Sequence, residues 1–203
     1  MDPTVQRRLI EEVANVVVSH ADELTTLDQA IGDGDHGLNM KRGAMAILER
    51  LDDLATKPLP EALKAAGQTL VMKVGGASGP LYGTLLMTLG KELPVAPIHG
   101  DVVRAVGTAV EAVKKIGRSD VGQKTMLDVL GPVHEELALS GPGLFDRVRQ
   151  RGAAAADATV PMRAIKGRAS FLGERSIGHM DPGARSASLM SAAVCTVMED
   201  ERG

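Results

Sequence analysis

The sequence has almost no aromatic residues: it contains no tryptophan, one tyrosine and two phenylalanines. Proteins that bind single-stranded nucleic acid stack bases on aromatic side chains and follow the phosphate backbone with a stripe of basic residues. Here the net charge is −3, and charges of both signs are mixed along the chain. The composition therefore predicts that nucleic acid is not a partner.

Cysteine and long apolar runs are equally scarce. The single cysteine, Cys195, cannot form a disulfide within the chain, and the N-terminal segment MDPTVQRRLIEE lacks the apolar core of a secretory signal. Charged or polar residues interrupt every apolar run before the ~18 residues that a membrane-spanning helix needs. We therefore expect a soluble protein of the reducing cytoplasm with no membrane partner.

Helical periodicity is what the sequence has instead. Apolar residues recur three or four positions apart, and the alternation typical of strands is nearly absent. The periodic segments cover residues 9–24, 44–54, 59–74, 81–89, 102–113, 126–137, 144 onward and 187–197. The 203 residues show no break in composition and suffice for one domain that buries about 70% of its unfolded surface. The sequence predicts an all-α fold of about eight helices in a single domain over residues 1–203.

The connections between these segments alternate in chemistry. The first, third, fifth and seventh are rich in glycine and cover residues 32–37, 75–79, 117–122 and 173–183. The second, fourth and sixth are short and contain proline. In an array of sequentially antiparallel helices, every second connection lies at the same end. We expect the four glycine loops to meet there and build one site, although each glycine alone could be only a helix C-cap.

The first glycine loop holds the acidic run GDGDHG. Asp33 and Asp35 flank one glycine, and Asp28 precedes Asp33 by five residues, so three carboxylates can surround one ion. Helix N-termini bind phosphate, and carboxylates beside a phosphate need a hard cation such as Mg²⁺ between them. An EF-hand is excluded because Leu38 and Ala44 stand where it needs glycine and glutamate. The acids could instead only cap the next helix.

Two middle loops supply further candidates for phosphate binding. VGGASGPLYGT places three glycines around Ser78 and suggests either a phosphate nest or a tight helix connection. GRSDVGQKT is close to the P-loop pattern, but Gln123 separates Gly122 from Lys124 and no strand precedes it, so we exclude a P-loop. We expect Lys124 to be solvated, as most lysines are. Gly117 or Met126 could contact phosphate or base.

The last loop, GRASFLGERSIGHMDPG, is longer than ordered connections usually are, which suggests a function. It carries Arg168, Arg175, His179 and Asp181. Arg175 could bind phosphate oxygens through its planar guanidinium, or could only pair with a surface carboxylate.

In these residues the chain closely resembles the ADP-binding L subunits of bacterial phosphotransferase-system (PTS)-dependent dihydroxyacetone kinases. Five motifs carry the resemblance in order: GDGDHG, GGASGPLYGT, GQKTMLD, GRASFLGERSIGH and DPGA. The resemblance implies an eight-helix antiparallel barrel with ADP and two Mg²⁺ ions tightly bound at one end. It implies that the Mg²⁺ ligands are Asp28, Asp33 and Asp35. The implied nucleotide contacts are His36, Gly37, Leu38, Asn39, Ala77, Ser78, Gly117, Met126, Arg175, Asp181, Pro182 and Gly183.

The resemblance also implies a mechanism and partners. A PTS phosphoprotein, the M-type subunit, would recharge the bound ADP to ATP, and a separate K-type subunit would hold the dihydroxyacetone that receives the γ-phosphoryl group. No residue is assigned a catalytic role, since phosphoryl transfer needs mostly positioning and charge neutralisation.

Two other functions stay open on sequence grounds. The chain could be the nucleotide domain of an ATP-dependent ketose or tetrose kinase, in which free ATP exchanges. It could also be a regulatory module whose nucleotide state is sensed by a transcription regulator. The chain departs from the family pattern at Arg185, where a small hydroxyl residue is expected, and in HMD in place of HQD.

Overall fold

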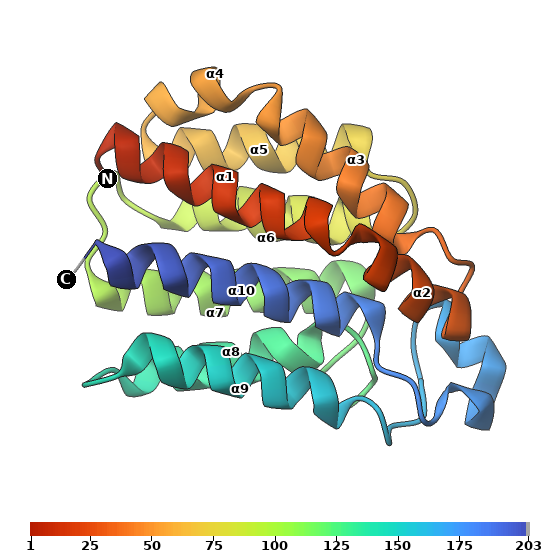
Figure 1. Ribbon diagram of the computed structural model, residues 1–203. Coiled ribbons are helices and arrows are strands. Elements are labelled where there is room, and N and C mark those ends of the chain that lie inside the picture. Colours follow the sequence, from red (N-terminus) through yellow and green to blue (C-terminus); the bar gives the residue numbers. More distant parts are fainter. Residues whose placement is uncertain (202–203) are drawn as a thin grey trace.

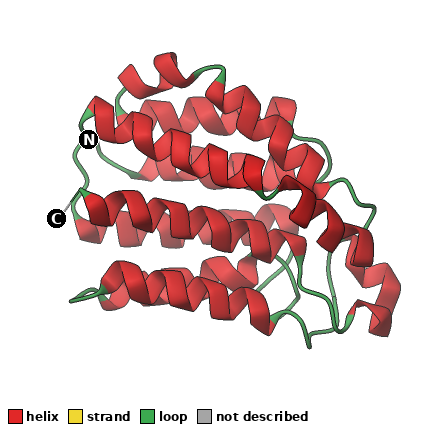
Figure 2. Ribbon diagram, viewed as in Figure 1, coloured by secondary structure: helices red, strands yellow, loops and turns green. Residues whose placement is uncertain are grey.

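The computed structural model describes residues 1–201, and within this range the chain forms helices and loops without a β-strand (Figure 2). The prediction of an all-α fold is confirmed. The helices are α1 (Pro3–Ser19), α2 (Ala21–Ile31), α3 (His36–Leu48), α4 (Leu51–Thr56), α5 (Leu59–Lys73), α6 (Ser78–Glu92), α7 (His99–Gly117), α8 (Leu127–Leu139), α9 (Leu144–Ala158), the 3₁₀ helix η1 (Arg168–Ser176) and α10 (Pro182–Asp200).

Two of the expected helices are each broken into two. His20 separates α1 from α2 at φ −102°, ψ 11°, and its ring Nδ1 lies 2.8 Å from the Val16 carbonyl oxygen. Arg50 separates α3 from α4 at φ −107°, ψ 12°, and its guanidinium donates to Thr69 Oγ1 on α5 at 2.7 Å. The apolar spacing continues across both breaks, so periodicity alone merges each pair.

The eight helices α1, α3, α5, α6, α7, α8, α9 and α10 form a closed ring (Figure 1). Each contacts the next along this series, and α10 returns to contact α1. The short α4 packs on α1 and α5, while α2 extends beyond α1 and contacts α3, α10 and η1. This closed ring is compatible with the barrel that the resemblance implies.

Small aliphatic residues fill the interior of the ring, as the scarcity of aromatics requires. Val113, Val129 and Ala187 belong to this core and are at most 1% exposed, whereas Phe171 is 88% exposed. Glycines let α5 and α6 approach closely, since a Cβ at Gly67 would lie 2.8 Å from the Gly83 carbonyl oxygen. Tight helix contacts thus replace bulky side chains in the core.

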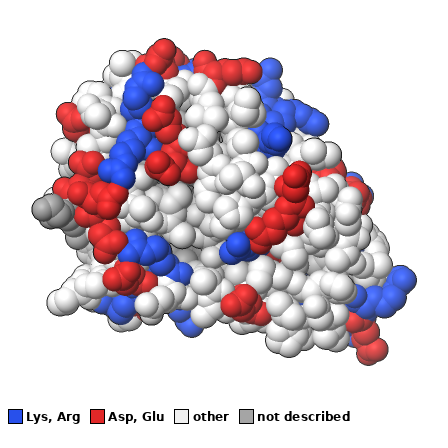
Figure 3. Space-filling model, viewed as in Figure 1, with Lys and Arg blue, Asp and Glu red and all other residues white. Residues whose placement is uncertain are grey.

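The surface carries charges of both signs, side by side, on the face shown in Figure 3. Many form ion pairs between neighbouring helices; Arg149 on α9, for example, pairs with Glu199 on α10. Within residues 1–201, none of the helices combines the length and apolar character that crossing a bilayer requires.

The connections that follow α2, α5, α7 and α9 lie at one end of the ring, opposite the end where α1 begins and α10 ends (Figure 1). The four glycine loops lie at these connections, so their predicted convergence at one end is confirmed. All four connections contribute residues to one cavity, but the third does so through Lys124, Thr125 and Met126, which follow the predicted loop 117–122.

Candidate nucleotide and metal site

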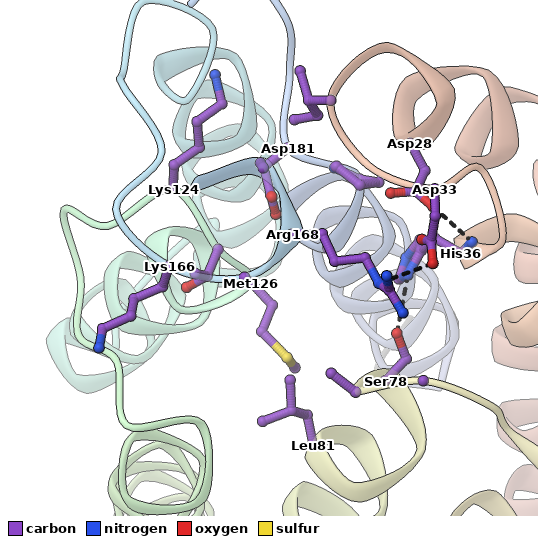
Figure 4. A pocket seen from close by; sticks show the side chains of 18 of the residues that line it. Asp28, Asp33, His36, Ser78, Leu81, Lys124, Met126, Lys166, Arg168 and Asp181 are labelled. Atoms are coloured by element: carbon purple, nitrogen blue, oxygen red, sulfur yellow. Dashed lines mark hydrogen bonds and ion pairs between the residues drawn. The ribbon is translucent and has the colours of Figure 1, made fainter. Parts of the chain in front are cut away.

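The cavity at this end of the ring is built by residues far apart in the sequence (Figure 4). Its lining comprises Asp28, Ile31, Asp33, Asp35 and His36 of the α2–α3 segment; Gly76, Ala77, Ser78, Leu81 and Tyr82 of the α5–α6 segment; Lys124, Thr125 and Met126 before α8; and Lys166, Gly167, Arg168, Ala169, Asp181, Pro182 and Gly183 of the α9–α10 segment.

Three carboxylates form the acidic side of the cavity. Asp28, Asp33 and Asp35 each offer an oxygen atom within 4.8 Å of the others. Oxygen donors are the ligands that Mg²⁺ prefers, so this donor set fits a hard divalent cation. Without a cation, like charges at this separation repel one another. Part of that repulsion is offset within the chain, because Arg168 Nε lies 2.8 Å from Asp33 Oδ2.

Asp28 also caps a helix, the role that the sequence offered as the alternative to metal binding. Its Oδ2 accepts hydrogen bonds from the backbone N–H groups of Asp35 at 2.8 Å and His36 at 3.0 Å, so it caps the N-terminus of α3. Asp35 is the N-cap residue but makes no side-chain cap bond. Capping therefore accounts for Asp28 only, and a capping carboxylate still has a second oxygen available for an ion.

The glycines of the acidic loop serve the carboxylates directly. A Cβ at Gly32 would lie 2.1 Å from Asp28 Oδ1, and Gly34 has a left-handed backbone at φ +75°. Any larger residue at position 32 would displace the Asp28 carboxylate. The glycine at this position therefore allows the backbone to approach the Asp28 carboxylate.

His36 links three helices through a chain of hydroxyl groups. Its Nδ1 lies 3.0 Å from Ser78 Oγ and its Nε2 lies 3.0 Å from Ser186 Oγ. Ser186 Oγ in turn lies 2.7 Å from the Tyr82 hydroxyl, which donates to the Gly183 carbonyl oxygen at 3.2 Å. Burial lowers the pKa of the His36 imidazole, against the opposing effect of nearby carboxylates. A neutral ring can donate from one nitrogen and accept at the other, as this network requires.

Asp181 caps the N-terminus of α10. Its Oδ2 accepts from the backbone N–H of Ala184 at 2.7 Å, and Pro182 occupies the first helical turn. Burial raises the pKa of the Asp181 carboxyl to about 7, with Asp128 acting in the same direction and the Ala184 hydrogen bond in the opposite one. The N-terminus of α10 is therefore capped by a carboxyl group that is partly protonated near neutral pH.

The segment before α8 is folded around Asp128 on that helix. Asp128 accepts from the backbone N–H groups of Gly122 at 2.5 Å and Thr125 at 2.6 Å. Lys124 lies between them in a left-handed conformation at φ +62° and is only 1% exposed. The expectation that Lys124 is solvated is wrong. The left-handed turn directs its side chain inward, where backbone carbonyl groups replace water as acceptors.

Seven of the residues implied as nucleotide contacts line the cavity: His36, Ala77, Ser78, Met126, Asp181, Pro182 and Gly183. Five others do not: Gly37, Leu38, Asn39, Gly117 and Arg175. Whether any of the twelve binds nucleotide stays a prediction.

The five residues outside the lining have other surroundings. A Cβ at Gly37 would lie 2.0 Å from the Ala21 carbonyl oxygen, so this glycine lets α3 pack on α2. Asn39 is buried beside Gly75, and Gly117 lies close to Leu81. Leu38 and Arg175 are exposed.

The structure adds cavity residues that sequence analysis did not select. Arg168 lies at the acidic cluster, although Arg175 was chosen as the anion-binding arginine of the same loop. Arg168 directly follows Gly167, and Arg175 lies two residues after Gly173, so their local sequences are similar. Only the fold of the loop shows which arginine faces the cavity. Tyr82, by contrast, could have been selected from the sequence. A lone tyrosine in an apolar helix needs a hydrogen-bond partner for its hydroxyl group, which indicates a nearby polar site.

Comparison with known proteins places this site in context. The chain matches the DAK2 domain over residues 30–196. It is 42% identical over 188 residues to the ADP-binding subunit DhaL of PEP-dependent dihydroxyacetone kinase 1 from Listeria innocua serovar 6a, an alignment that covers 92% of both chains. It is 40% identical over 184 residues to the corresponding DhaL subunit from Escherichia coli K12, covering 87% of this chain and 88% of the relative.

A solved structure shares the fold. The dihydroxyacetone kinase of C. freundii, in complex with AMP-PNP and Mg²⁺, superposes with a TM-score of 0.78 at 27% sequence identity. The superposition covers 95% of this chain and 34% of that protein, so the chain spans about a third of its length.

Proposed function

The chain belongs to the DAK2 domain family, and from this membership we propose that it is the ADP-binding subunit of a dihydroxyacetone kinase. The observation that carries the proposal is the meeting of Asp28, Asp33 and Asp35 with helix N-termini in one cavity. Subunits that match this chain over about nine-tenths of both lengths are named as ADP-binding.

The residues of the cavity suit a nucleoside diphosphate with Mg²⁺. The N-terminus of α6 begins at Ser78 and has no side-chain cap, so its N–H groups can bind phosphate oxygens. Arg168 carries a guanidinium into the same region. Leu81 and Met126 lie side by side on another wall (Figure 4) and would contact the base.

We infer that Asp28, Asp33 and Asp35 hold two Mg²⁺ ions, which supply positive charge between the carboxylates and the phosphate oxygens. The chain itself contributes positioning: the Asp28 cap fixes the acidic loop on α3, and the His36 network fixes Ser78 against α10. Phosphoryl transfer relies on such positioning and on charge neutralisation rather than on an acid–base pair.

We infer two protein partners from the same family membership. A K-type subunit would present dihydroxyacetone at the open side of the cavity, and an M-type PTS phosphoprotein would donate the phosphoryl group. In this scheme the nucleotide stays bound between the two transfers.

A first test is mass spectrometry of the gently purified, undenatured protein. The proposal expects ADP to be retained at one equivalent per chain. Nucleotide-free protein that fails to bind ADP in the presence of Mg²⁺ would exclude this function.

A second test removes one carboxylate. We expect Asp33→Ala to abolish phosphoryl transfer in the reconstituted system and to weaken Mg²⁺ or Mn²⁺ binding, because one ion ligand is lost. Asp22→Ala, which removes an exposed carboxylate on α2, is the matched control. Both variants should retain the wild-type circular dichroism spectrum. Wild-type activity in Asp33→Ala would mean that the acids serve the helix alone.

An ATP-dependent kinase is a second candidate, because the similar C. freundii structure contains AMP-PNP within a chain about three times as long. Purified protein that is empty, and that turns over free ATP together with a K-type partner, would favour it. Retained stoichiometric ADP would favour the PTS-dependent scheme.

A further inference from the structure

Lys124 is the largest of the fully buried side chains among the described residues, and neither the proposed metal ligands nor the implied nucleotide contacts include it. Lysine is almost never fully buried unless its ammonium group is paired. A left-handed backbone is also unfavourable for a residue with a side chain. A residue that combines both features is held there by its surroundings, and such positions cluster at functional sites.

The partners of Lys124 lie far away in the sequence. Its Nζ donates to the carbonyl oxygen of Met162 at 2.9 Å and to that of Ser176 at 2.6 Å. These two carbonyl groups stand at the start and the end of the segment 162–176, which contains η1. One ammonium group therefore joins both ends of this segment to the loop before α8.

The segment 162–176 carries cavity residues between these two anchor points. Lys166, Gly167 and Arg168 all line the cavity, and Arg168 pairs with Asp33 across it (Figure 4). The segment contains no α-helix, and its 3₁₀ helix η1 packs on α2, which itself lies outside the ring.

Few other hydrogen bonds hold the segment in place. Within it, the Ala164 N–H donates to Ser176 Oγ at 2.9 Å. The Ile165 N–H donates to the Gln123 carbonyl oxygen at a long 3.3 Å, next to Lys124 itself. The segment has one other charged link to the site, the Arg168–Asp33 ion pair at 2.8 Å, and that pair is largely exposed to water. The two bonds from Lys124 are charge-assisted and come from a side chain that is 1% exposed, so water competes with them less.

We propose that Lys124 is a positioning residue that ties the segment 162–176 over the cavity and thereby sets the place of Arg168 beside the acidic cluster. Lys124 acts through the backbone of the segment, because both of its hydrogen bonds go to backbone carbonyl groups. The part of this inference that concerns nucleotide rests on the proposed function, whereas the tie itself does not.

Limited proteolysis tests the tie without any ligand. The segment 162–176 contains four trypsin sites: Arg163, Lys166, Arg168 and Arg175. In Lys124→Met we expect cleavage at these sites to be about tenfold faster, since loss of charge-assisted hydrogen bonds raises the population of the open segment. Lys115→Met, which changes an exposed lysine on α7, is the matched control and should be cut at the wild-type rate.

The location of the cuts separates positioning from general stability. Cleavage confined to 163–175 supports the proposal, and cleavage spread over the ring helices, or no acceleration, overturns it. Where wild-type protein binds ADP and Mg²⁺, we also expect Lys124→Met to release a fluorescent ADP analogue about tenfold faster, while Lys115→Met does not. Failure of the wild-type protein to bind ADP would reject the proposed function and leave the proteolysis result valid.

A measurement on the wild type covers the case in which Lys124→Met does not fold. Acetic anhydride can modify Lys124 only when its ammonium group leaves the interior. If Lys124 ties the segment, both should open together. The opening frequency calculated from the acetylation rate of Lys124 should then equal the one calculated from hydrogen exchange of the Ala164 and Ile165 amides. Exchange of these amides while Lys124 stays unmodified would show that the segment opens without it and would overturn the proposal.

Discussion

At the scale of single residues, burial decides chemistry that residue type alone leaves open. Asp28 and Asp181 are both buried carboxylates that cap helix N-termini. Asp28 belongs to the acidic cluster, whereas burial is the largest influence on the pKa of Asp181. His36 becomes a neutral cross-link because both ring nitrogens face hydroxyl groups. Lys124 becomes a structural cation because two carbonyl groups replace water.

The raised pKa of Asp181 predicts a specific pH dependence of stability. The carboxyl loses its proton near pH 4 in the unfolded chain and near pH 7 in the folded one, so between these values the folded state binds more protons and stability falls as pH rises. In Asp181→Asn, which preserves the helix cap, this contribution of at most about 1.4 kcal/mol per pH unit should vanish.

The measurement is urea unfolding of metal-free and nucleotide-free protein from pH 4.5 to 7.5. The charged groups facing Asp181 are Lys124, Asp128 and Asp28, and they are unchanged in the variant. Equal pH slopes in wild type and Asp181→Asn would contradict the assignment.

At the scale of helices, close packing of α2 on α3 accounts for Gly37, which the resemblance implies to be a nucleotide contact. In Gly37→Ala the new methyl group would collide with the Ala21 carbonyl oxygen at 2.0 Å and Thr25 Oγ1 at 2.3 Å. We expect α2 and α3 to separate at a cost of about 1–3 kcal/mol in the free energy of unfolding. Gly100→Ala is the control, since a Cβ there meets nothing within 4 Å. Unchanged stability with lost ADP binding would restore the role that the resemblance implies.

Arg185, where the chain departs from the family pattern, is also explained between helices. It lies on α10, and its Nε donates to Glu23 Oε1 on α2 at 2.6 Å, outside the cavity lining. We expect Arg185→Ser to lower stability by less than about 1 kcal/mol, because both side chains are partly exposed.

A double-mutant cycle with Glu23→Gln, monitored by urea unfolding, gives the coupling energy of this pair. ADP affinity should be unchanged in Arg185→Ser. A large loss of affinity would place Arg185 in the nucleotide site after all.

At the scale of the whole molecule, the ring brings four distant segments to one ligand. A ligand at about 100 times its dissociation constant stabilises the fold by roughly 2.7 kcal/mol, which for this chain length raises the melting temperature by roughly 5 to 10 °C. We expect this shift with ADP plus Mg²⁺ and a much smaller one when EDTA removes the metal. Equal shifts with and without metal would argue against carboxylate-bound Mg²⁺.

The sequence by itself determined the fold class and the end of the molecule at which the site lies. Helical spacing depends on local geometry, and alternate connections of antiparallel helices must share an end, so both can be read from the order of residues. The resemblance to dihydroxyacetone kinase L subunits is likewise confirmed. The breaks at His20 and Arg50 could not be read, because the apolar spacing continues across them.

Only the tertiary structure decided which side chains share the cavity. Arg168 lines the cavity, whereas Arg175 is exposed and Lys124 is buried. Gly32 makes room for the Asp28 carboxylate, and Gly37 allows two helices to pack. His36 contacts Ser186, which is 150 residues away in the sequence. The physical reason is that burial, hydrogen-bond partners and electrostatic surroundings are set by distances between segments far apart in the chain. Local sequence patterns carry no information on those distances.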